Sequence, residues 1–173
     1  MKKITIISLS VFALIMACKT TSGNKNELVL MLQPKSDTQV SGSAAFTEKN
    51  GVVSFVANIK GLTPGEHAIH IHEKSDCSAP DASSAGGHWN PTFKKHGKWG
   101  SSEYHKGDIG NFTADANGNA IVKFETDEWC IGCDDETKNI VGKSIIVHKG
   151  SDDFTTQPTG NAGGRVACTA IIK

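Results

Sequence analysis

The sequence predicts an all-β protein, a sandwich or barrel of about eight short strands. Apolar and polar residues alternate over short segments, as they do in half-buried strands. Turn pairs such as Asn50-Gly51 and Asn117-Gly118 separate neighbouring segments, which is typical of antiparallel hairpins. Glycine is frequent and aromatic residues are few, in keeping with a chain that turns often.

Four strands are expected in the first half of the chain. The segment 27–32 is a plausible first strand. The segments 40–46 and 52–59 flank Glu48-Lys49-Asn50-Gly51 and form an expected hairpin. The segment 65–73 carries a His-Ile-His stretch. Regular alternation then stops from Lys74 to about Asp108, and a loop of this length is either functional or disordered. Its histidines, prolines and glycines favour a function.

The second half contributes the remaining strands. The segments 109–113 and 120–125 enclose a turn at 115–118 and form a second expected hairpin. A short apolar strand, 144–148, ends in histidine. The irregular stretch 149–164 then leads to a closing strand at 165–172. The sequence therefore predicts a β fold with two long functional loops.

Length and charge narrow the functional classes. The chain has 173 residues, enough for one domain with a core of its own. It has 18 basic and 18 acidic residues, a balance that gives no argument for a nucleic-acid partner.

The N-terminus has the features expected of an export signal. Lys2 and Lys3 precede an apolar run from Ile4 to Ala17, which is too short to span a bilayer and suits a signal peptide. The run closes with Ile15-Met16-Ala17-Cys18, which resembles a bacterial lipobox. We expect a signal peptide at 1–17, a lipid-anchored Cys18 with a polar tether over 18–26, and a folded domain at 27–173. The expected location is the bacterial periplasm, at the cell envelope. The alternative is ordinary secretory cleavage with Cys18 incidental.

Export changes the interpretation of the other cysteines. Cys77, Cys130, Cys133 and Cys168 would reach a compartment in which disulfides persist. Their even number is consistent with two disulfides, but spacing alone does not decide how they pair.

The histidines suggest a metal site. Successive side chains of a strand point to opposite faces, so His70 and His72 share one face. Imidazoles suit zinc, copper, iron and nickel. Any one loop histidine is more often an ordinary polar residue. Six histidines and an aspartate around one long loop are hard to explain in that way: His70, His72, His88, His96, His105, His148 and Asp108.

Residues from about 27 to the end resemble a copper–zinc superoxide dismutase, and its bacterial exported branch in particular. The matching stretches are HIHEKSDC, SAGGHWNP, KHG, YHKGDIGN, IIVHKGSDD and GNAGGRVAC, in the family's order and with similar spacing. The resemblance implies a Greek-key antiparallel β-sandwich, or flattened barrel. It also implies one copper and one zinc per subunit.

The resemblance assigns residues to this chemistry. It implies copper ligands His70, His72, His88 and His148, and zinc ligands His88, His96, His105 and Asp108, with His88 shared. Asp152 matches an aspartate that links a copper histidine to a zinc histidine, here His70 and His96. Its alternative is a turn residue. Arg165 matches the arginine that holds the superoxide anion, and its alternative is a surface residue at a strand start.

The resemblance also pairs Cys77 with Cys168. Cys130 and Cys133 have no counterpart in the family pattern. In an exported protein a local disulfide is the expected state of this pair. An accessory Cu(I) site is the alternative, because soft thiolates favour that ion.

The activity implied is dismutation of superoxide to dioxygen and hydrogen peroxide, with Arg165 orienting the substrate and His88 handling a proton. A non-catalytic copper and zinc carrier on the same fold is the alternative. The resemblance leaves both a monomer and a homodimer open.

Overall fold

The computed structural model describes residues 26–173. The predicted signal peptide, Cys18 and the tether up to residue 25 lie outside these residues. The described part contains eight strands and one short 3-10 helix, η1 (Ser83–Ala85). The strands are β1 (Asn26–Pro34), β2 (Ser41–Lys49), β3 (Val52–Lys60), β4 (Gly65–His72), β5 (Gly110–Ala114), β6 (Ala120–Thr126), β7 (Ser144–His148) and β8 (Arg165–Ala170). The predicted all-β class is confirmed.

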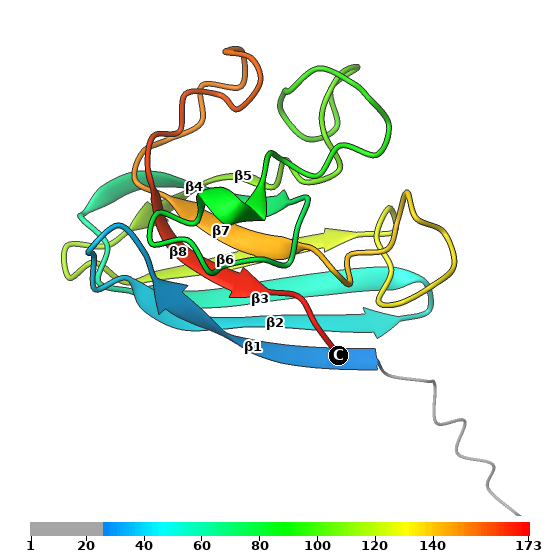
Figure 1. The fold of residues 1–173 in the computed structure, drawn as a ribbon, viewed down its shortest axis with the longest axis horizontal. Helices are drawn as coiled ribbons and strands as arrows, with labels where there is room; N and C mark the ends of the chain where they lie inside the picture. The colour runs from blue at the N-terminus through cyan, green and yellow to red at the C-terminus, as the bar shows by residue number, and fades with distance from the viewer. Residues whose placement is uncertain (1–25) are drawn as a thin grey trace, which may run out of the picture.

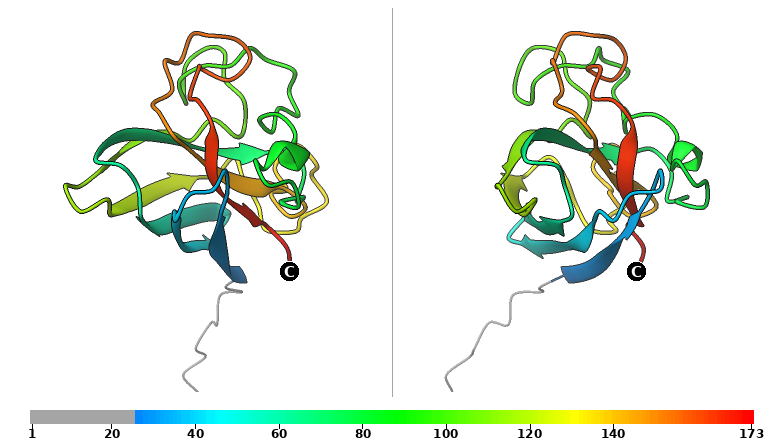
Figure 2. Two further views of the ribbon diagram at one scale, coloured as in Figure 1. Left: turned by 60° about the vertical axis from the view of Figure 1, so that its left-hand side comes forward. Right: turned by 90° about the vertical axis from the view of Figure 1, so that its left-hand side faces the viewer.

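The strands pair antiparallel in the order β5-β4-β7-β8-β1-β2-β3-β6. They form a nearly closed, flattened barrel in which two groups of four strands face each other (Figure 2). The groups join where Gln33 and Pro34 of β1 pair with Cys168 and Ala167 of β8. This arrangement is consistent with the predicted Greek-key sandwich. Among the described residues, no helix has the length and apolar character needed to cross a membrane.

The β2–β3 hairpin shows how local sequence builds this barrel. Asn50 and Gly51 both adopt positive φ, 53° and 78°, as a tight hairpin turn requires. The turn sets a register in which Phe46 lies opposite Phe55. Both rings are fully buried with centroids 4.8 Å apart, so the pair anchors one wall of the core.

The strands β4 and β7 are buried on both faces, which matters for function. Ile69, Ile71, Ile145 and Val147 point into the main core of the barrel. The alternate residues of β4 point the other way, yet His70 and His72 are also fully buried. Much of the loop 73–109 and the loop 149–164 lie on one side of the barrel, at the top of Figure 1, while the part that contains η1 lies lower. The two loops cover the outward histidines.

Candidate metal centre

The framework of the site is a row of side chains on three adjacent strands. His70 and His72 lie on the outer face of β4, and β7 ends at His148 beside them. His148 pairs with Arg165 at the start of β8, where the register shifts. Backbone pairing thus places the arginine directly beside the third histidine.

The first long loop is attached to this framework through backbone hydrogen bonds. Trp89 N donates to Ile71 O (2.9 Å), and Ile71 N donates to Gly107 O (2.9 Å). A Cβ on Gly107 would lie 2.2 Å from Ile71 O, so only glycine permits this approach. The attachment brings His88 into an isolated antiparallel bridge with His72 and places Asp108 next to it in space.

Two clusters of buried ligand atoms result. Within each cluster one ligand atom per residue lies within 4.8 Å of all the others. The first consists of His70, His72, His88 and His148, and the second of His88, His96, His105 and Asp108. These are the two sets that the sequence resemblance implied, and His88 belongs to both.

Asp108 organises the second cluster. Its Oδ1 accepts from His88 Nδ1 (2.8 Å) and lies 3.3 Å from His105 Nδ1, while Oδ2 lies 2.9 Å from His96 Nδ1. The backbone amide of His105 also donates to Oδ2 (2.8 Å). Burial alone would raise the pKa of Asp108, but the imidazoles of His105, His88 and His96 beside its carboxylate hold it well below its usual range.

Acceptors behind the histidines determine which ring nitrogen faces each cluster. His72 Nδ1 donates to Gly86 O (2.9 Å) and His148 Nδ1 to Gly163 O (3.3 Å), which turns both Nε2 atoms inward. His105 Nε2 donates to Lys94 O (3.1 Å), which leaves its Nδ1 for the second cluster.

Asp152 connects the two clusters from behind. It accepts from His70 Nε2 (3.0 Å) and from His96 Nε2 (2.8 Å), one histidine of each set. Gly160 lies against this link, since a Cβ there would be 1.7 Å from Asp152 Oδ1. Burial alone would raise the pKa of Asp152, but the two histidine hydrogen bonds lower it below its usual range. The placement matches the linking role that the resemblance implied.

The histidine pKa values differ between the clusters. Burial lowers the pKa of His88 to about 4, although the hydrogen bond to Asp108 opposes it. Burial likewise holds the pKa of His72 and His148 well below the usual value. Burial would also lower the pKa of His96, but Asp108 and Asp152 outweigh it and raise that pKa to about 9. His72, His88 and His148 of the first cluster are therefore neutral rings with available lone pairs.

These residues fit metal ions. In residues 26–173, four of the five buried side-chain polar atoms without a hydrogen-bond partner are ring nitrogens of the clusters: His70 Nδ1, His88 Nε2, His96 Nδ1 and His105 Nδ1. In addition, His72 Nε2 and His148 Nε2 face each other at 3.4 Å with both hydrogens directed elsewhere. Lone pairs in this arrangement repel each other unless a cation lies between them.

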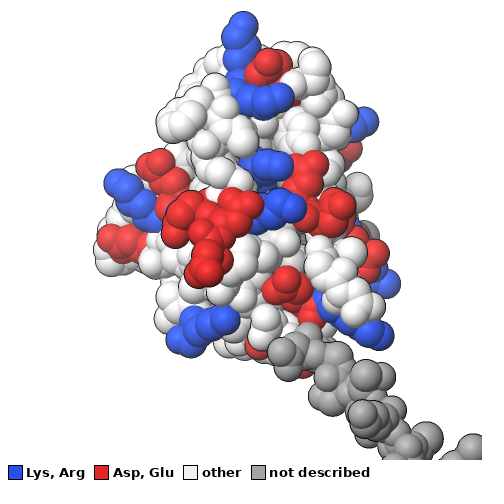
Figure 3. Space-filling model, turned by 90° about the vertical axis from the view of Figure 1, so that its right-hand side faces the viewer, with Lys and Arg blue, Asp and Glu red and all other residues white. Residues whose placement is uncertain are grey.

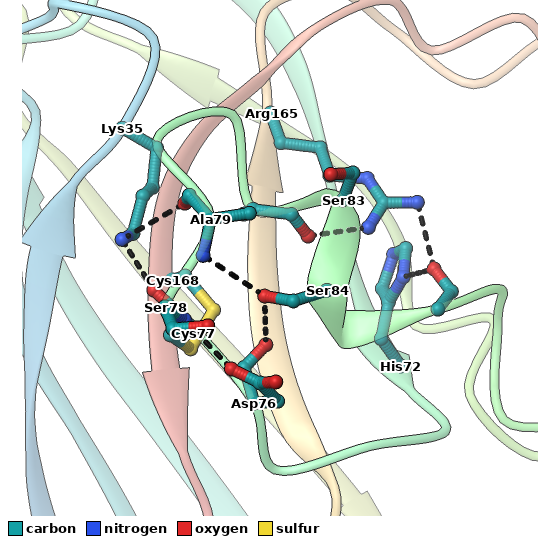
Figure 4. The surroundings of a disulfide bond; sticks show 12 residues. Lys35, His72, Asp76, Cys77, Ser78, Ala79, Ser83, Ser84, Arg165 and Cys168 are labelled. Carbon is teal, nitrogen blue, oxygen red and sulfur yellow. Dashed lines mark hydrogen bonds between the residues drawn. A yellow bond between two sulfur atoms is a disulfide. The ribbon is translucent and has the colours of Figure 1, made fainter.

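Arg165 is half-buried beside the first cluster. Its Nη1 donates to Ala82 O and its Nη2 to Gly86 O, both at 2.7 Å. Gly86 O therefore accepts from both Arg165 and His72 (Figure 4). The fork geometry leaves the guanidinium fixed in direction while it stays charged.

His67 belongs to the site but was not identified from the sequence. It lies on the inward face of β4, so its parity groups it with the core isoleucines. Its Nδ1 donates to His148 O (3.0 Å), and its Nε2 lies 2.8 Å from Thr63 O. The sequence signal that could have identified His67 was the presence of a histidine on the apolar face of a strand.

Both expected cysteine pairs are disulfides in the structure. Cys77 is bonded to Cys168 of β8, across 91 residues of sequence. Cys130 is bonded to Cys133, only three residues away.

The chain matches the family model for copper/zinc superoxide dismutase (SODC) over residues 40–171. It belongs to the copper/zinc superoxide dismutase family. A Cu-Zn superoxide dismutase 2 from Aquifex aeolicus is 38% identical over 79% of this chain and 81% of its own length. A Cu-Zn superoxide dismutase from Caulobacter vibrioides is 38% identical over 78% of this chain and 80% of its own. An extracellular Cu-Zn superoxide dismutase from Caenorhabditis elegans is 32% identical over 79% of this chain and 63% of its own.

Family and site agree on the activity. The family uses copper and zinc to dismutate superoxide, and the two histidine clusters fit these two metals. The chain is therefore a superoxide-dismutating oxidoreductase, and the alternative of a carrier without turnover is less well supported.

Proposed function

We propose that this enzyme holds copper with His70, His72, His88 and His148, and zinc with His88, His96, His105 and Asp108. The observation that carries this division is the orientation of His88, which directs Nε2 to one cluster and Nδ1 to the other. His88 would therefore offer one nitrogen to each set of ligands. When bound, copper supplies the one-electron redox chemistry and zinc supplies a fixed positive charge.

The protein groups have distinct roles in this proposal. Arg165 binds and orients the superoxide anion, since its charged fork lies next to His148 in the strand register. When His88 Nε2 is not bound to copper, it would hold a proton close to the anion. His70 and His96 keep their ring directions because Asp152 accepts from both. Two superoxide anions and two protons then give one dioxygen and one hydrogen peroxide.

Stopped-flow measurement of superoxide decay tests the proposal. Enzyme loaded with copper and zinc is compared with enzyme loaded with zinc alone, and rapid decay is expected only in the first sample. An Arg165→Gln variant that retains both metals should lose rate and should bind a small probe anion, azide, more weakly. Copper-dependent decay that is unchanged in this variant would contradict the role of Arg165.

We also propose that the chain is an exported lipoprotein of the bacterial envelope, anchored through Cys18. Support comes from Lys2, Lys3, the apolar run at 4–17 and the lipobox-like residues before Cys18. Both disulfides suit an oxidising compartment. Labelling with a radioactive fatty acid in a bacterial host should mark the full chain but not a Cys18→Ala variant. Equal labelling of the two would contradict the anchor.

The proposed chemistry needs only one chain. All residues of both clusters come from the same chain, so a monomer and each half of a homodimer are equally competent. Sedimentation of the metal-loaded enzyme distinguishes these two states.

A further inference from the structure

The connection between β1 and β2 contacts the segment that carries Arg165. We call the residues Lys35–Thr38 the clasp. Lys35 N donates to Val166 O (2.9 Å), and Thr38 Oγ1 donates to the same oxygen (2.8 Å). Ser36 Oγ donates to Arg165 O (2.8 Å). The clasp thus holds the backbone of Arg165 and of the residue that follows it.

The clasp also holds the loop closed by the Cys77–Cys168 disulfide. Lys35 Nζ donates to Cys77 O, and it donates to Ala79 O at 3.2 Å (Figure 4). Ser36 N donates to Pro80 O (2.8 Å). One short segment therefore binds two regions that are far apart in sequence.

The loop residues that Lys35 contacts are connected to the guanidinium of Arg165 through one turn. Ala82 N donates to Ala79 O (2.9 Å), which closes a turn over residues 79–82. Ala82 O in turn accepts from Arg165 Nη1 (2.7 Å). The carbonyl that Lys35 holds and the carbonyl that Arg165 holds are thus the two ends of the same turn.

The lysine is well suited to this role. Lys35 is half-buried, and two backbone carbonyls converge on its ammonium group. Hydrogen bonds from a charged donor are the stronger ones, and loss of the donor would leave these carbonyls without it. Ser36 and Asp37 both have positive φ, 52° and 57°, a conformation that persists only where surrounding contacts hold it.

We propose that Lys35 is a positioning residue for Arg165: it fixes the turn that supplies one of the two acceptors of the guanidinium. This inference rests on the proposed role of Arg165 in holding superoxide. Because Lys35 acts on the acceptor at Ala82 and not on the one at Gly86, its loss should leave the metal clusters intact and should loosen the arginine.

The test compares Lys35→Met, Lys35→Arg and Lys143→Met in the copper- and zinc-loaded enzyme, alongside Arg165→Gln. Lys143 is another half-buried lysine, outside both the clasp and the metal clusters, and serves as the matched control. We expect Lys35→Met to reduce kcat/KM and azide affinity about three- to tenfold, because a displaced binding group lowers the rate. Lys35→Arg should restore most of both, and Lys143→Met should change neither.

Two further readouts separate positioning from simple loss of charge. Long-range steering is screened at high ionic strength, so a positioning defect should persist at 0.5 M salt, a condition at which the Debye length is about 4 Å. The Arg165 guanidinium protons, followed by NMR in the zinc-only protein, should exchange faster in Lys35→Met than in Lys143→Met.

The outcomes distinguish the two proposals. Wild-type rate at high salt and unchanged proton exchange in Lys35→Met would overturn the positioning role, even where Arg165→Gln is impaired. An unimpaired Arg165→Gln variant would instead overturn the role of Arg165 itself, and with it the reason for a clasp.

Discussion

The two disulfides differ in the length of chain that they close and in their distance along the chain from Arg165. Cys77–Cys168 links a long loop to β8 across 91 residues, three positions from Arg165. Cys130–Cys133 spans three residues within the loop that follows β6. In the chain-entropy description the first bond stabilises the fold by roughly 4 to 5 kcal/mol and the second by roughly 2 kcal/mol. The first disulfide therefore ties the loop near the site to β8, whereas the second only closes a short local loop.

The neighbourhood of Cys130 explains why its closure matters little for shape. Cys130 N donates to Lys138 O (2.8 Å), and Ile140 N donates to Cys130 O (3.1 Å). Asn139 Oδ1 accepts from Gly132 N (3.0 Å), and its Nδ2 donates to Cys133 O (3.0 Å). These bonds fix both cysteine backbones without the sulfurs.

The surface of this loop also differs from the site. Asp127, Asp134, Asp135 and Glu136 are exposed on it. The loop lies on the right in Figure 1, the side that Figure 3 faces, and that face shows acidic side chains gathered near its centre with basic side chains beside them. A superoxide anion is not attracted to such a surface, so this loop is a poor approach for the substrate.

Removal of the long disulfide should have the largest effect. The double variant Cys77→Ser, Cys168→Ser is expected to lose about 2 to 5 kcal/mol of unfolding free energy. It should also lose activity, because the loop that carries the Ala82 acceptor is no longer tied to β8. Denaturant unfolding and superoxide decay measure the two effects. Full activity in a variant that has lost stability would show that the disulfide is not needed to position Arg165.

A pair of glycine variants should sharpen the comparison. Gly160→Ala places a Cβ 1.7 Å from Asp152 Oδ1 and 2.6 Å from His96 Nε2, so it should break the link between the clusters. We expect zinc affinity to fall about 10- to 100-fold, as when the carboxylate behind a metal ligand is removed.

Gly132→Ala is the matched control in the other loop. Gly132 also has positive φ, 78°, but its Cβ would meet only the flexible end of Lys173. Competition with a chelating dye measures zinc affinity in both variants. Equal affinities would contradict the strict need for glycine beside Asp152.

The two histidine environments predict opposite titrations in the metal-free protein. Burial lowers the pKa of His88 to about 4, below that of an unfolded histidine, so this residue stabilises the fold less as the pH falls from about 6.5 towards 4. The pKa of His96 is raised to about 9, so its contribution is present below about 6.5 and is lost as the pH rises through 9.

Ring chemical shifts followed by NMR, from a pH well below 4 up to one above 9, measure both titrations. We expect Asp108→Asn to lower the pKa of His96. The amide chemical shifts of residues 130–133, in the loop of the short disulfide, should not change. A His96 pKa that stays near 9 in this variant would contradict the contribution of Asp108 to the shift.

The smallest effect is expected from the short disulfide. The double variant Cys130→Ser, Cys133→Ser should lose at most about 2 kcal/mol of unfolding free energy and should keep full copper-dependent activity. A mild dithiol should also reduce this bond before Cys77–Cys168, since Cys168 is fully buried and Cys133 is half-exposed. Mass spectrometry after alkylation reports the order. Simultaneous reduction of both bonds would remove the distinction between them.

Much of the fold and of the candidate site could be predicted from sequence patterns. Turn residues such as Asn50-Gly51 set hairpins, and the alternation in β4 placed His70 and His72 on one face, so local rules sufficed. The six histidines and Asp108 were recognised as candidate ligands because the ability of a side chain to bind a metal follows from its residue type, which the sequence gives directly.

The remaining features depend on contacts between distant segments. Ala82 and Gly86 serve Arg165 through backbone carbonyls, which any residue has, so no motif marks them. Gly160 matters through an approach to Asp152 that appears only when two parts of the loop meet. Lys35 resembles any other lysine until the β1–β2 connection folds onto the disulfide loop.

The carbonyl of Gly86 has one further consequence. An oxygen of this kind has two lone pairs, and here one receives His72 and the other Arg165. His72, a proposed copper ligand, and Arg165, the proposed binding group for superoxide, therefore share one backbone acceptor, which has no lone pair left for water. Neither function can drift independently during evolution: a change in loop shape that suits a different anion would also turn an imidazole. Redesign of this enzyme for another small anion should begin by giving Arg165 an acceptor of its own.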